Sequence, residues 1–308
     1  MTKKILITPK SYYRIKDKML PLLKDYELKF NDTGKTFTED QMKDLVQDVD
    51  GIIIGVDPIT DDVIDNANNL KAISKYGVGM DNIDVDKAKN EGIKIRKTPG
   101  TNNISVAELA IGLMFNVARN ISINVNKVKN NKWERVKGVE LTDKTLGVIG
   151  CGNIGQEVVK RARGLQMSVL IHDPYFDDEK LIEDEKINQV NKHELLANAD
   201  FISLHLPLNN ETANIISKKE IKIMKDTVFL INTARGELID DDALLWGLKN
   251  KELAGVACDV FSQEPPNDHP LLEFDNFLLT PHIGANTEES VYRMAEQATK
   301  NIIEMLNG

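Results

Sequence analysis

The chain has 308 residues, of which 41% are hydrophobic and 28% are charged, and its formal net charge at pH 7 is -9. This length exceeds the usual size of one hydrophobic core, so we expect two domains. The ordinary apolar content excludes an intrinsically disordered protein. The negative charge argues against binding to nucleic acid or to an anionic membrane surface, so neither is an expected partner.

Short apolar segments alternate along the chain with longer mixed segments of helix length. The apolar segments lack regular polar alternation, which is typical of strands buried on both faces of a parallel sheet. Strands separated by helices indicate βαβ units, so we predict an α/β fold throughout. The predicted strands are, in chain order, KKILIT, GIIIGV, LKAISKY, IKIRKT, TLGVIG, SVLIHD, DFISLHL, TVFLINT, LAGVACDVF and NFLLT.

A long helical pattern from Ser105 to about Asn130 interrupts this alternation. Ser105 and Glu108 match a capping box, in which the hydroxyl accepts from an early helical N–H and the carboxylate reaches back. The Pro99–Gly100 turn just before it is a boundary signal, so we place a domain crossover near residues 98–101. The residues predicted on the buried face of the helix are Val106, Leu109, Ala110, Leu113 and Val117.

A GxGxxG pattern lies between the predicted strand TLGVIG and the amphipathic segment QEVVKRARGL. A strand before the glycines and a helix after them predict a dinucleotide-binding loop rather than a chance glycine turn. Gly150 permits the tight turn, Gly152 lets the backbone approach a pyrophosphate, and Gly155 allows close packing of helix on strand. Asn153 and Ile154 complete the loop, where the helix N-terminus supplies N–H donors for the anion.

Asp173 ends the next predicted strand, 18 residues after Gly155, close to the spacing of about 20 that this fold uses. Its carboxylate is expected to bind the adenosine ribose hydroxyls. The same charge would repel a 2′-phosphate, so the sequence favours NAD over NADP as cofactor. The alternative is a turn aspartate that precedes Pro174.

Cys151 and Cys258 are too few for a disulfide scaffold, and the N-terminal segment MTKKILITPK has no signal-peptide pattern. These features favour a cytoplasmic protein. Cys151 lies in the glycine loop without a second cysteine or a histidine nearby, so we predict no metal site.

Three candidate catalytic residues follow predicted strands, where open α/β sheets bind their ligands. Arg235 can bind a carboxylate through its planar fork. His282 can exchange a proton with a ketone or hydroxyl oxygen, and an ionised Glu264 would stabilise the imidazolium and raise its pKa. Each also has a structural alternative: a core or capping histidine, a solvated loop glutamate and a surface arginine.

The motifs SKYGVGMDNID, TPGTNNISVAEL, KTLGVIGCGNIG, SLHLPLNNET, NTARGELID, ACDVFSQEPP and TPHIGANT occur in an order that resembles the D-isomer-specific 2-hydroxyacid dehydrogenase family. The resemblance implies two Rossmann-like or flavodoxin-like lobes with parallel sheets. Residues 1–99 and 284–308 would form the substrate-binding lobe. Residues 100–283 would form the NAD-binding lobe inserted into it, and two such lobes would pair in a homodimer with the Ser105 helix near the interface.

The resemblance also implies roles for individual residues. Arg235, Glu264 and His282 would form the catalytic group. The substrate carboxylate would meet backbone N–H groups of Gly77-Val78-Gly79, with further substrate contacts from Lys75, Asn102, Arg235 and His282. Thr233 and Asp259 would hold the nicotinamide carboxamide, and the remaining cofactor contacts would come from His205, Pro207, Thr212, Ala234, His282 and Gly284.

Within the family the chain is most similar to D-3-phosphoglycerate dehydrogenases and their short relatives. Where those enzymes often carry an Arg-Ser pair, this chain has Gly55-Val56-Asp57-Pro58. Asp57 would oppose a phosphate, whereas Lys10 or Lys75 could replace the missing arginine. Hydroxypyruvate, glyoxylate and D-lactate chemistry therefore stay open as alternatives.

More distant alternatives are phosphite oxidation and an NAD-sensing interaction protein. A formate dehydrogenase is not expected, because those relatives carry glutamine where Glu264 stands. The length leaves no room for a serine-sensing regulatory domain after Gly308.

Overall fold

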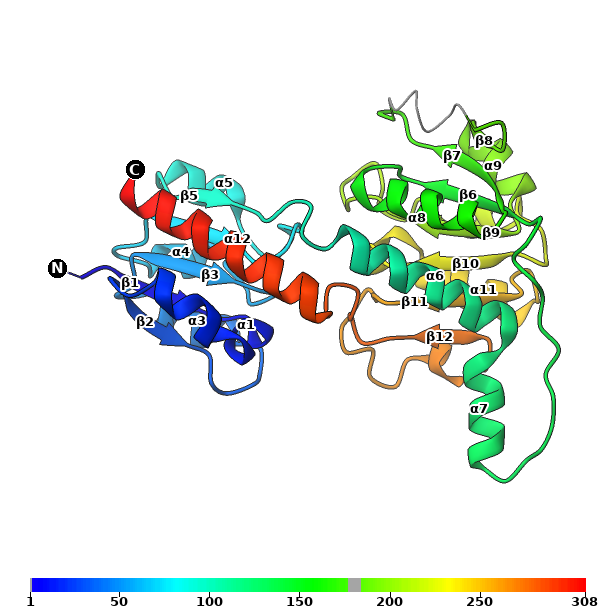
Figure 1. Ribbon diagram of the computed structural model, residues 1–308, viewed down its shortest axis with the longest axis horizontal. Coiled ribbons are helices and arrows are strands. Elements are labelled where there is room, and N and C mark those ends of the chain that lie inside the picture. The colour runs from blue at the N-terminus through cyan, green and yellow to red at the C-terminus, as the bar shows by residue number, and fades with distance from the viewer. Residues whose placement is uncertain (1, 177–183) are drawn as a thin grey trace. The chain divides into compact units, whose positions relative to one another are not determined.

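The computed structural model describes residues 2–176 and 184–308. The chain forms two compact units (Figure 1). The discontinuous unit runs to Asn102 and resumes at Ala285, and the inserted unit extends from Asn103 to Gly284. The sequence places the two crossings after residues 99 and 283. The predicted α/β fold of two parallel-sheet lobes is confirmed.

The discontinuous unit is built on a five-stranded parallel sheet in the order β2-β1-β3-β4-β5, the doubly wound 2-1-3-4-5 order. Helices α1, α2 and α12 pack on one face of the sheet and α3, α4 and α5 on the other. In Figure 1, α12 lies along β3 and β4. The strands are β1 Lys4–Ile7, β2 Glu27–Phe30, β3 Gly51–Ile54, β4 Ala72–Lys75 and β5 Lys94–Arg96. The helices are α1 Lys10–Arg14, α2 Lys16–Met19, η1 Leu20–Leu22, α3 Glu39–Leu45, α4 Asp61–Asp65, α5 Val85–Asn90 and α12 Glu288–Asn307.

The inserted unit is built on a seven-stranded parallel sheet in the order β12-β11-β10-β9-β6-β7-β8. The strand order reverses between β6 and β9, which is where a Rossmann sheet binds a dinucleotide. Helices α6 and α8 cover one face, and α9, α10 and α11 cover the other. The strands are β6 Thr145–Ile149, β7 Ser168–His172, β8 Ile187–Gln189, β9 Phe201–Leu204, β10 Phe229–Asn232, β11 Gly255–Cys258 and β12 Phe277–Leu279. The helices are α6 Asn103–Arg119, α7 Ile121–Lys129, α8 Asn153–Gly164, α9 Lys192–Asn198, α10 Lys218–Ile221, η2 Gly236–Leu238, α11 Asp241–Lys249 and η3 Pro270–Glu273.

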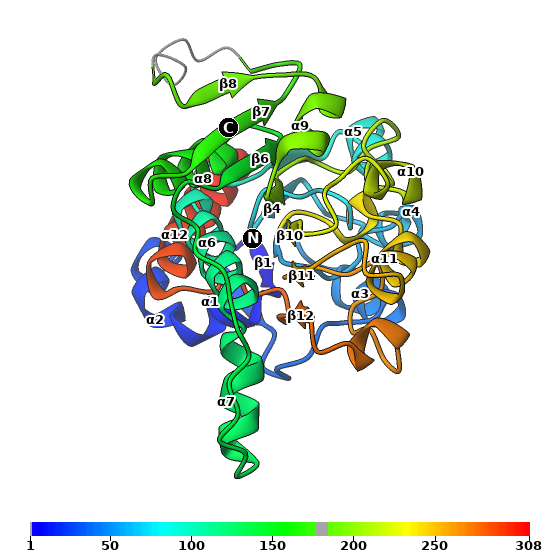
Figure 2. The same ribbon diagram turned by 90° about the vertical axis from the view of Figure 1, so that its right-hand side faces the viewer.

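The helix predicted from Ser105 differs from the observed one at both ends. Helix α6 begins at Asn103, so Ser105 is a buried helical residue and the predicted capping box is wrong. Glu108 instead forms an ion pair with Arg161 of α8, 3.2 Å away. The helix stops near Asn120, whose positive φ of 51° breaks the regular backbone, and α7 follows with a bend of 63°. Figure 2 shows α7 projecting away from the sheet of its unit.

Among residues 2–176 and 184–308, no single helix is long and apolar enough to cross a membrane. Helices α6 and α7 together have the length and composition of a span, but the pair is bent by 63°.

Candidate active site

The loop from Gly150 to Gly155 joins β6 to α8 as the motif predicts. Gly150 has a φ of +88°, and a Cβ there would lie 2.7 Å from the carbonyl oxygen of His205. A Cβ on Gly155 would collide with the carbonyl oxygen of Gly150. A Cβ on Gly152, the N-cap of α8, would meet no atom within 4 Å. Two glycines thus allow the tight turn, and the third leaves the helix N-terminus open to an anion.

Asp173 directly follows β7, the strand beside β6. Its carboxylate accepts hydrogen bonds from the backbone amides of Cys151, at 2.7 Å, and Tyr175, at 2.8 Å. The carboxylate therefore lies against the glycine loop, at the edge of the sheet where a bound ribose is expected.

Three further predicted cofactor residues, His205, Pro207 and Thr212, follow β9. The Nε2 of His205 lies 2.8 Å from the hydroxyl of Ser203. Burial lowers the pKa of His205 to about 4, so this ring is neutral at pH 7. The hydroxyl of Thr212 donates to the carbonyl of Pro207 at 2.7 Å, which closes the loop after the strand.

Two of these residues carry buried polar atoms without a hydrogen-bond partner in the described part of the chain. They are the Nδ1 of His205 and the hydroxyl of Thr233. Both residues directly follow adjacent central strands, β9 and β10. Buried polar atoms are rarely left unpaired, and these two fit a polar cofactor at the carboxyl edge of the sheet.

His282 and Glu264 meet in the structure although 17 residues separate them in the chain. The Nδ1 of His282 lies 2.9 Å from the Oε2 of Glu264, whose Oε1 accepts from the amide of Phe261 at 3.0 Å. The side chains are 46% and 40% exposed, respectively, so both stay open to a ligand. With Nδ1 turned to the carboxylate, Nε2 is the nitrogen that can face a substrate.

The two side chains shift each other's proton affinity. The hydrogen bond to Glu264 raises the pKa of His282, against the opposing effects of burial and of the positive charge of Arg235. Burial alone would raise the pKa of Glu264, but the bond to His282 and its positive charge outweigh burial and lower that pKa. The pair therefore favours a protonated imidazole beside an ionised carboxylate.

Asp259 holds the loop that carries His282. Its carboxylate accepts from the hydroxyl of Thr280 at 2.6 Å and from the amides of Ile283 at 2.8 Å and Gly284 at 2.7 Å. Asp259 is 1% exposed, and His282 adopts a positive φ of 52°. The sequence predicts a nicotinamide contact for Asp259 and misses this organising role, for which the hydroxyl of Thr280 is the only local signal.

Arg235 follows β10 in a turn set by its neighbours. Its Nη1 donates to the carbonyl of Ala234 at 2.6 Å. A Cβ on Gly236 would overlap the backbone of Phe261 and Ser262, so only glycine lets this turn approach the Glu264 loop. No sequence pattern identifies Asn232, whose buried side chain bonds to this turn.

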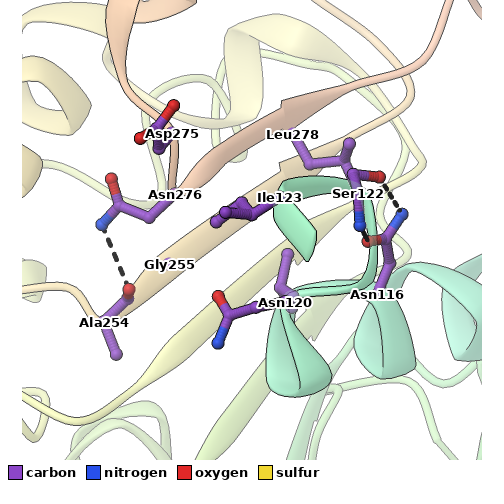
Figure 3. Close-up of a pocket in the computed structure, with 10 residues that line it drawn as sticks. Asn116, Asn120, Ser122, Ile123, Ala254, Gly255, Asp275, Asn276 and Leu278 are labelled. Atoms are coloured by element: carbon purple, nitrogen blue, oxygen red, sulfur yellow. Dashed lines mark hydrogen bonds between the residues drawn. The ribbon is translucent and has the colours of Figure 1, made fainter. Parts of the chain in front are cut away.

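A pocket of about 330 Å³ opens beside these groups, lined by Asp259, Val260, Phe261, Glu264, Pro265, Pro266, Leu279, Thr280, Pro281 and His282. It lies at the carboxyl ends of β11 and β12. A second pocket, of about 30 Å³, lies at the opposite edge of the same sheet, where the side chain of Asn276 points to the carbonyl of Ala254 (Figure 3). Because that volume is about the share of one liquid water, the second pocket is too small for a substrate.

The predicted carboxylate-binding segment of the discontinuous unit follows β4. The amide of Gly77 already donates to the hydroxyl of Thr98 at 2.9 Å, so this N–H is engaged inside the fold. Within residues 2–176 and 184–308, the amides of Val78 and Gly79 donate to no other atom. Two of the three predicted donors are therefore open to an anion. Asn102, the last residue before the first crossing, is buried.

Two of the three charged candidates of the discontinuous unit are held inside it. Lys75 is 6% exposed, and its Nζ donates at 2.5 Å both to the carbonyl of Gly55 and to the Oδ1 of Asn82. Asp57 is 2% exposed and accepts from the hydroxyl of Thr8 and the amide of Phe37. The carboxylate of Asp57 is therefore engaged inside the fold, and its opposition to a bound phosphate stays a prediction. Lys10 is exposed at the start of α1.

Comparisons with known proteins agree with this architecture. Residues 111–284 match the model of the D-isomer specific 2-hydroxyacid dehydrogenase, NAD binding domain. The chain is 42% identical over 280 residues to a hydroxypyruvate reductase of Thermotoga maritima, and the match covers 89% of this chain and 90% of that protein. It is also 42% identical over 276 residues to a D-3-phosphoglycerate dehydrogenase of Methanocaldococcus jannaschii, with 88% of this chain and 52% of that protein covered.

The chain spans about half the length of the phosphoglycerate dehydrogenases that it matches. Among solved structures, a D-lactate dehydrogenase of Aquifex aeolicus complexed with NAD and lactic acid superposes with a TM-score of 0.87 at 30% identity, covering 99% of this chain and 96% of that one. The chain therefore belongs to the D-isomer specific 2-hydroxyacid dehydrogenase family, and its inserted unit contains the NAD-binding domain of that family.

Proposed function

We propose that this protein is an NAD-dependent dehydrogenase that interconverts a small D-2-hydroxy acid and the corresponding 2-keto acid. The observation that carries the proposal is the hydrogen bond of 2.9 Å between His282 and Glu264, with the charge of Arg235 acting on both. All three follow neighbouring strands at the carboxyl edge of one sheet, beside a pocket large enough for a small acid.

The residues present fit the cofactor, because the Gly150–Gly155 loop leaves its helix N-terminus open and His205 and Thr233 carry unpaired polar atoms. When bound, NADH would supply the hydride added to carbon 2 of the keto acid, and NAD+ would accept the hydride taken from carbon 2 of the hydroxy acid. During reduction, the Nε2 of His282 gives a proton to the ketone oxygen. During oxidation, the same nitrogen takes the proton of the hydroxyl group. Arg235 binds the substrate carboxylate through its guanidinium.

The preferred substrate is proposed to be unphosphorylated, with hydroxypyruvate and glyoxylate first. The sequence favours 3-phosphohydroxypyruvate, with a lysine in place of the missing arginine. Against that, Lys75 is engaged with Gly55 and Asn82, which supports a substrate without phosphate. One relative of nearly equal length is named a hydroxypyruvate reductase, and another is named a glyoxylate reductase. Phosphoglycerate dehydrogenase activity, D-lactate oxidation and pyruvate reduction are the competing outcomes.

A substrate panel tests this proposal. NADH oxidation is followed with hydroxypyruvate, glyoxylate, pyruvate and 3-phosphohydroxypyruvate, and the oxidative direction is followed with phosphite and formate. We expect turnover with the first two at the highest kcat/KM, and a clear preference for NADH over NADPH because of Asp173. Turnover with none of the keto acids would contradict the proposed class of reaction, whereas a preference for the phosphorylated acid would contradict only the substrate.

A homodimer formed through the inserted unit is also proposed. Ile121, Val125 and Val128 project from α7 at helical spacing and are 47%, 45% and 50% exposed. Trp133, in the segment that follows, is 84% exposed. Exposed apolar groups gathered on a projecting helix are typical of an interface. We expect the wild-type protein to scatter light as a dimer and Val125→Glu to scatter as a monomer; a monomeric wild type contradicts the proposal.

A cytoplasmic location is proposed as well. The two cysteines are buried free thiols, which supports a reducing compartment. Cell fractionation tests this, and recovery of the protein outside the cytoplasm contradicts it.

A further inference from the structure

Asn232 is the last residue of β10 and is 1% exposed. Its side-chain amide makes two hydrogen bonds to the turn that follows. The Oδ1 accepts from the amide of Ala234 at 3.0 Å, and the Nδ2 donates to the carbonyl of Arg235 at 2.7 Å. One buried side chain therefore fixes the backbone on both sides of the peptide that joins Ala234 to Arg235.

Few side chains other than asparagine can make both hydrogen bonds at position 232. The side chain must present an acceptor and a donor at once, at the reach of one methylene group. Aspartate has nearly the same shape but lacks the donor, and as an anion it would face the carbonyl of Arg235 in a buried place. Alanine would leave the amide of Ala234 and the carbonyl of Arg235 without their partners.

The guanidinium of Arg235 is bonded to the same turn that Asn232 holds. The Nη1 of Arg235 donates to the carbonyl of Ala234, within the peptide that Asn232 brackets. On its far side the turn is held by Gly236, which packs directly against the backbone of Phe261 and Ser262. Asn232 and Gly236 thus clamp the turn from its two ends.

We propose that Asn232 is a positioning residue for Arg235, which orients the guanidinium for a substrate carboxylate. The inference rests on the proposed function, because it assumes that Arg235 binds that carboxylate. Asn232 itself does not touch the substrate. Its effect on carboxylate binding passes entirely through Arg235, and a displacement of about 1 Å in a positioned group can cost on the order of 100-fold in rate.

A double-mutant cycle tests the coupling. Oxamate, a carboxylate analogue of pyruvate, is titrated into the enzyme–NADH complex of the wild type, Asn232→Asp, Arg235→Lys and the double variant, and its Kd is measured from NADH fluorescence. We expect Asn232→Asp to raise the oxamate Kd by about 10-fold to 100-fold. In the Arg235→Lys background the same change should raise it by less than about threefold, because residues that act as a unit are non-additive.

Two readouts separate positioning from general damage. Because Asn232 also bonds to Ala234, an expected cofactor contact, the Kd of NADH is measured as well, and positioning of Arg235 predicts that Asn232→Asp raises the oxamate Kd by a larger factor than the NADH Kd. The matched control is Asn276→Asp, which removes a donor to the carbonyl of Ala254 at the opposite edge of the same sheet (Figure 3) and should leave the oxamate Kd unchanged. If Asn232→Asp does not fold, Asn232→Ser, which keeps a neutral polar group, enters the same cycle.

Turnover of the wild type with hydroxypyruvate or glyoxylate is read first. Absence of turnover with every keto acid contradicts the proposed function and this inference with it. Turnover by the wild type combined with an unchanged oxamate Kd in the Asn232 variant contradicts the inference alone. Effects of Asn232→Asp and Arg235→Lys that multiply in the double variant also contradict it, because they would show that Asn232 acts independently of Arg235.

Discussion

Two charged residues near the carboxyl edge of one sheet and an ionisable pair near that of the other differ sharply in exposure. In the discontinuous unit, Lys75 and Asp57 are 6% and 2% exposed. Their charged atoms are bound by Gly55, Asn82, Thr8 and Phe37. In the inserted unit, the side chains of Glu264 and His282 are 40% and 46% exposed. A charge that follows a strand is therefore no sign of a ligand site until its exposure and partners are known.

The physical reason for the contrast lies in desolvation. A buried charge loses its hydration and is tolerated only when hydrogen bonds satisfy it, so Lys75 and Asp57 join loops together. The pair of Glu264 and His282 keeps part of its hydration, and the hydrogen bond between them raises the pKa of His282. The first arrangement stabilises the edge of a sheet, and the second is suited to proton transfer.

Among the substitutions considered, removal of the His282 imidazole should lower turnover the most. His282→Ala is expected to lower kcat for keto acid reduction by roughly 10²–10⁴-fold, because general acid catalysis is lost. The NADH Kd should change little. Steady-state kinetics measure kcat, and NADH fluorescence measures the Kd. His193→Ala, at an exposed position of α9, is the control, and near-normal turnover of His282→Ala would remove this residue from the mechanism.

Loss of the Arg235 guanidinium should have the second largest effect on turnover. Arg235→Ala should lower kcat/KM for keto acids by roughly 100-fold, because the carboxylate loses its charged partner. Arg235→Lys keeps the charge but not the planar fork, so its kcat/KM should fall between the wild type and the alanine variant. Equal kcat/KM values for lysine and arginine would mean that bidentate binding plays no part.

The substitution Glu264→Gln tests whether Glu264 raises the pKa of His282. Since Glu264 raises the pKa of His282, the neutral glutamine should lower it again. Reduction requires protonated His282, so the rate of keto acid reduction falls as the pH rises. This fall should begin at a lower pH in the variant than in the wild type. Oxidation requires neutral His282, so the rate of hydroxy acid oxidation should begin to rise at a lower pH in the variant than in the wild type. We expect a fall in kcat of about tenfold at neutral pH; unshifted pH–rate profiles would contradict the coupling.

Substitution in the discontinuous unit should affect stability rather than turnover. Lys75→Met leaves the carbonyl of Gly55 and the amide of Asn82 with fewer partners, so we expect the free energy of unfolding to fall by about 1–3 kcal/mol. Urea denaturation measures it, and Lys10→Met, at an exposed position, is the matched control. A normal stability together with a raised KM for 3-phosphohydroxypyruvate alone would identify Lys75 as a phosphate contact.

Most strands that the sequence predicts contain several buried residues, although the edge strands β5 and β12 are predicted as well. Ten apolar segments correspond to observed strands, whereas β2 and β8 are not predicted. Both lie at the edges of their sheets, where one side has no neighbouring strand. The strand β2 has no buried residue, and β8 has one. An edge strand can take its conformation from the strand that it joins, so β2 and β8 form without a strong apolar pattern of their own.

Local motifs predict the parts of the site that depend on backbone geometry. The glycine spacing predicts the turn at Gly150 and the open helix N-terminus, because these depend on the absence of a Cβ. The same approach fails at Ser105, which matches a cap but lies inside α6. It also leaves open whether Arg235, Glu264 and His282 converge, since no local pattern contains the distance between separate loops.

The sequence by itself determined the α/β fold, the glycine loop and the identity of the residues that can exchange protons or bind carboxylates. These follow from apolar runs, backbone freedom and side-chain chemistry, all of which are local properties. Only the tertiary structure decided which of those groups face solvent, that Lys75 and Asp57 are held within the fold, and that His282 meets Glu264. Exposure and proton affinity arise from neighbours distant in the chain, and folding alone brings those neighbours together.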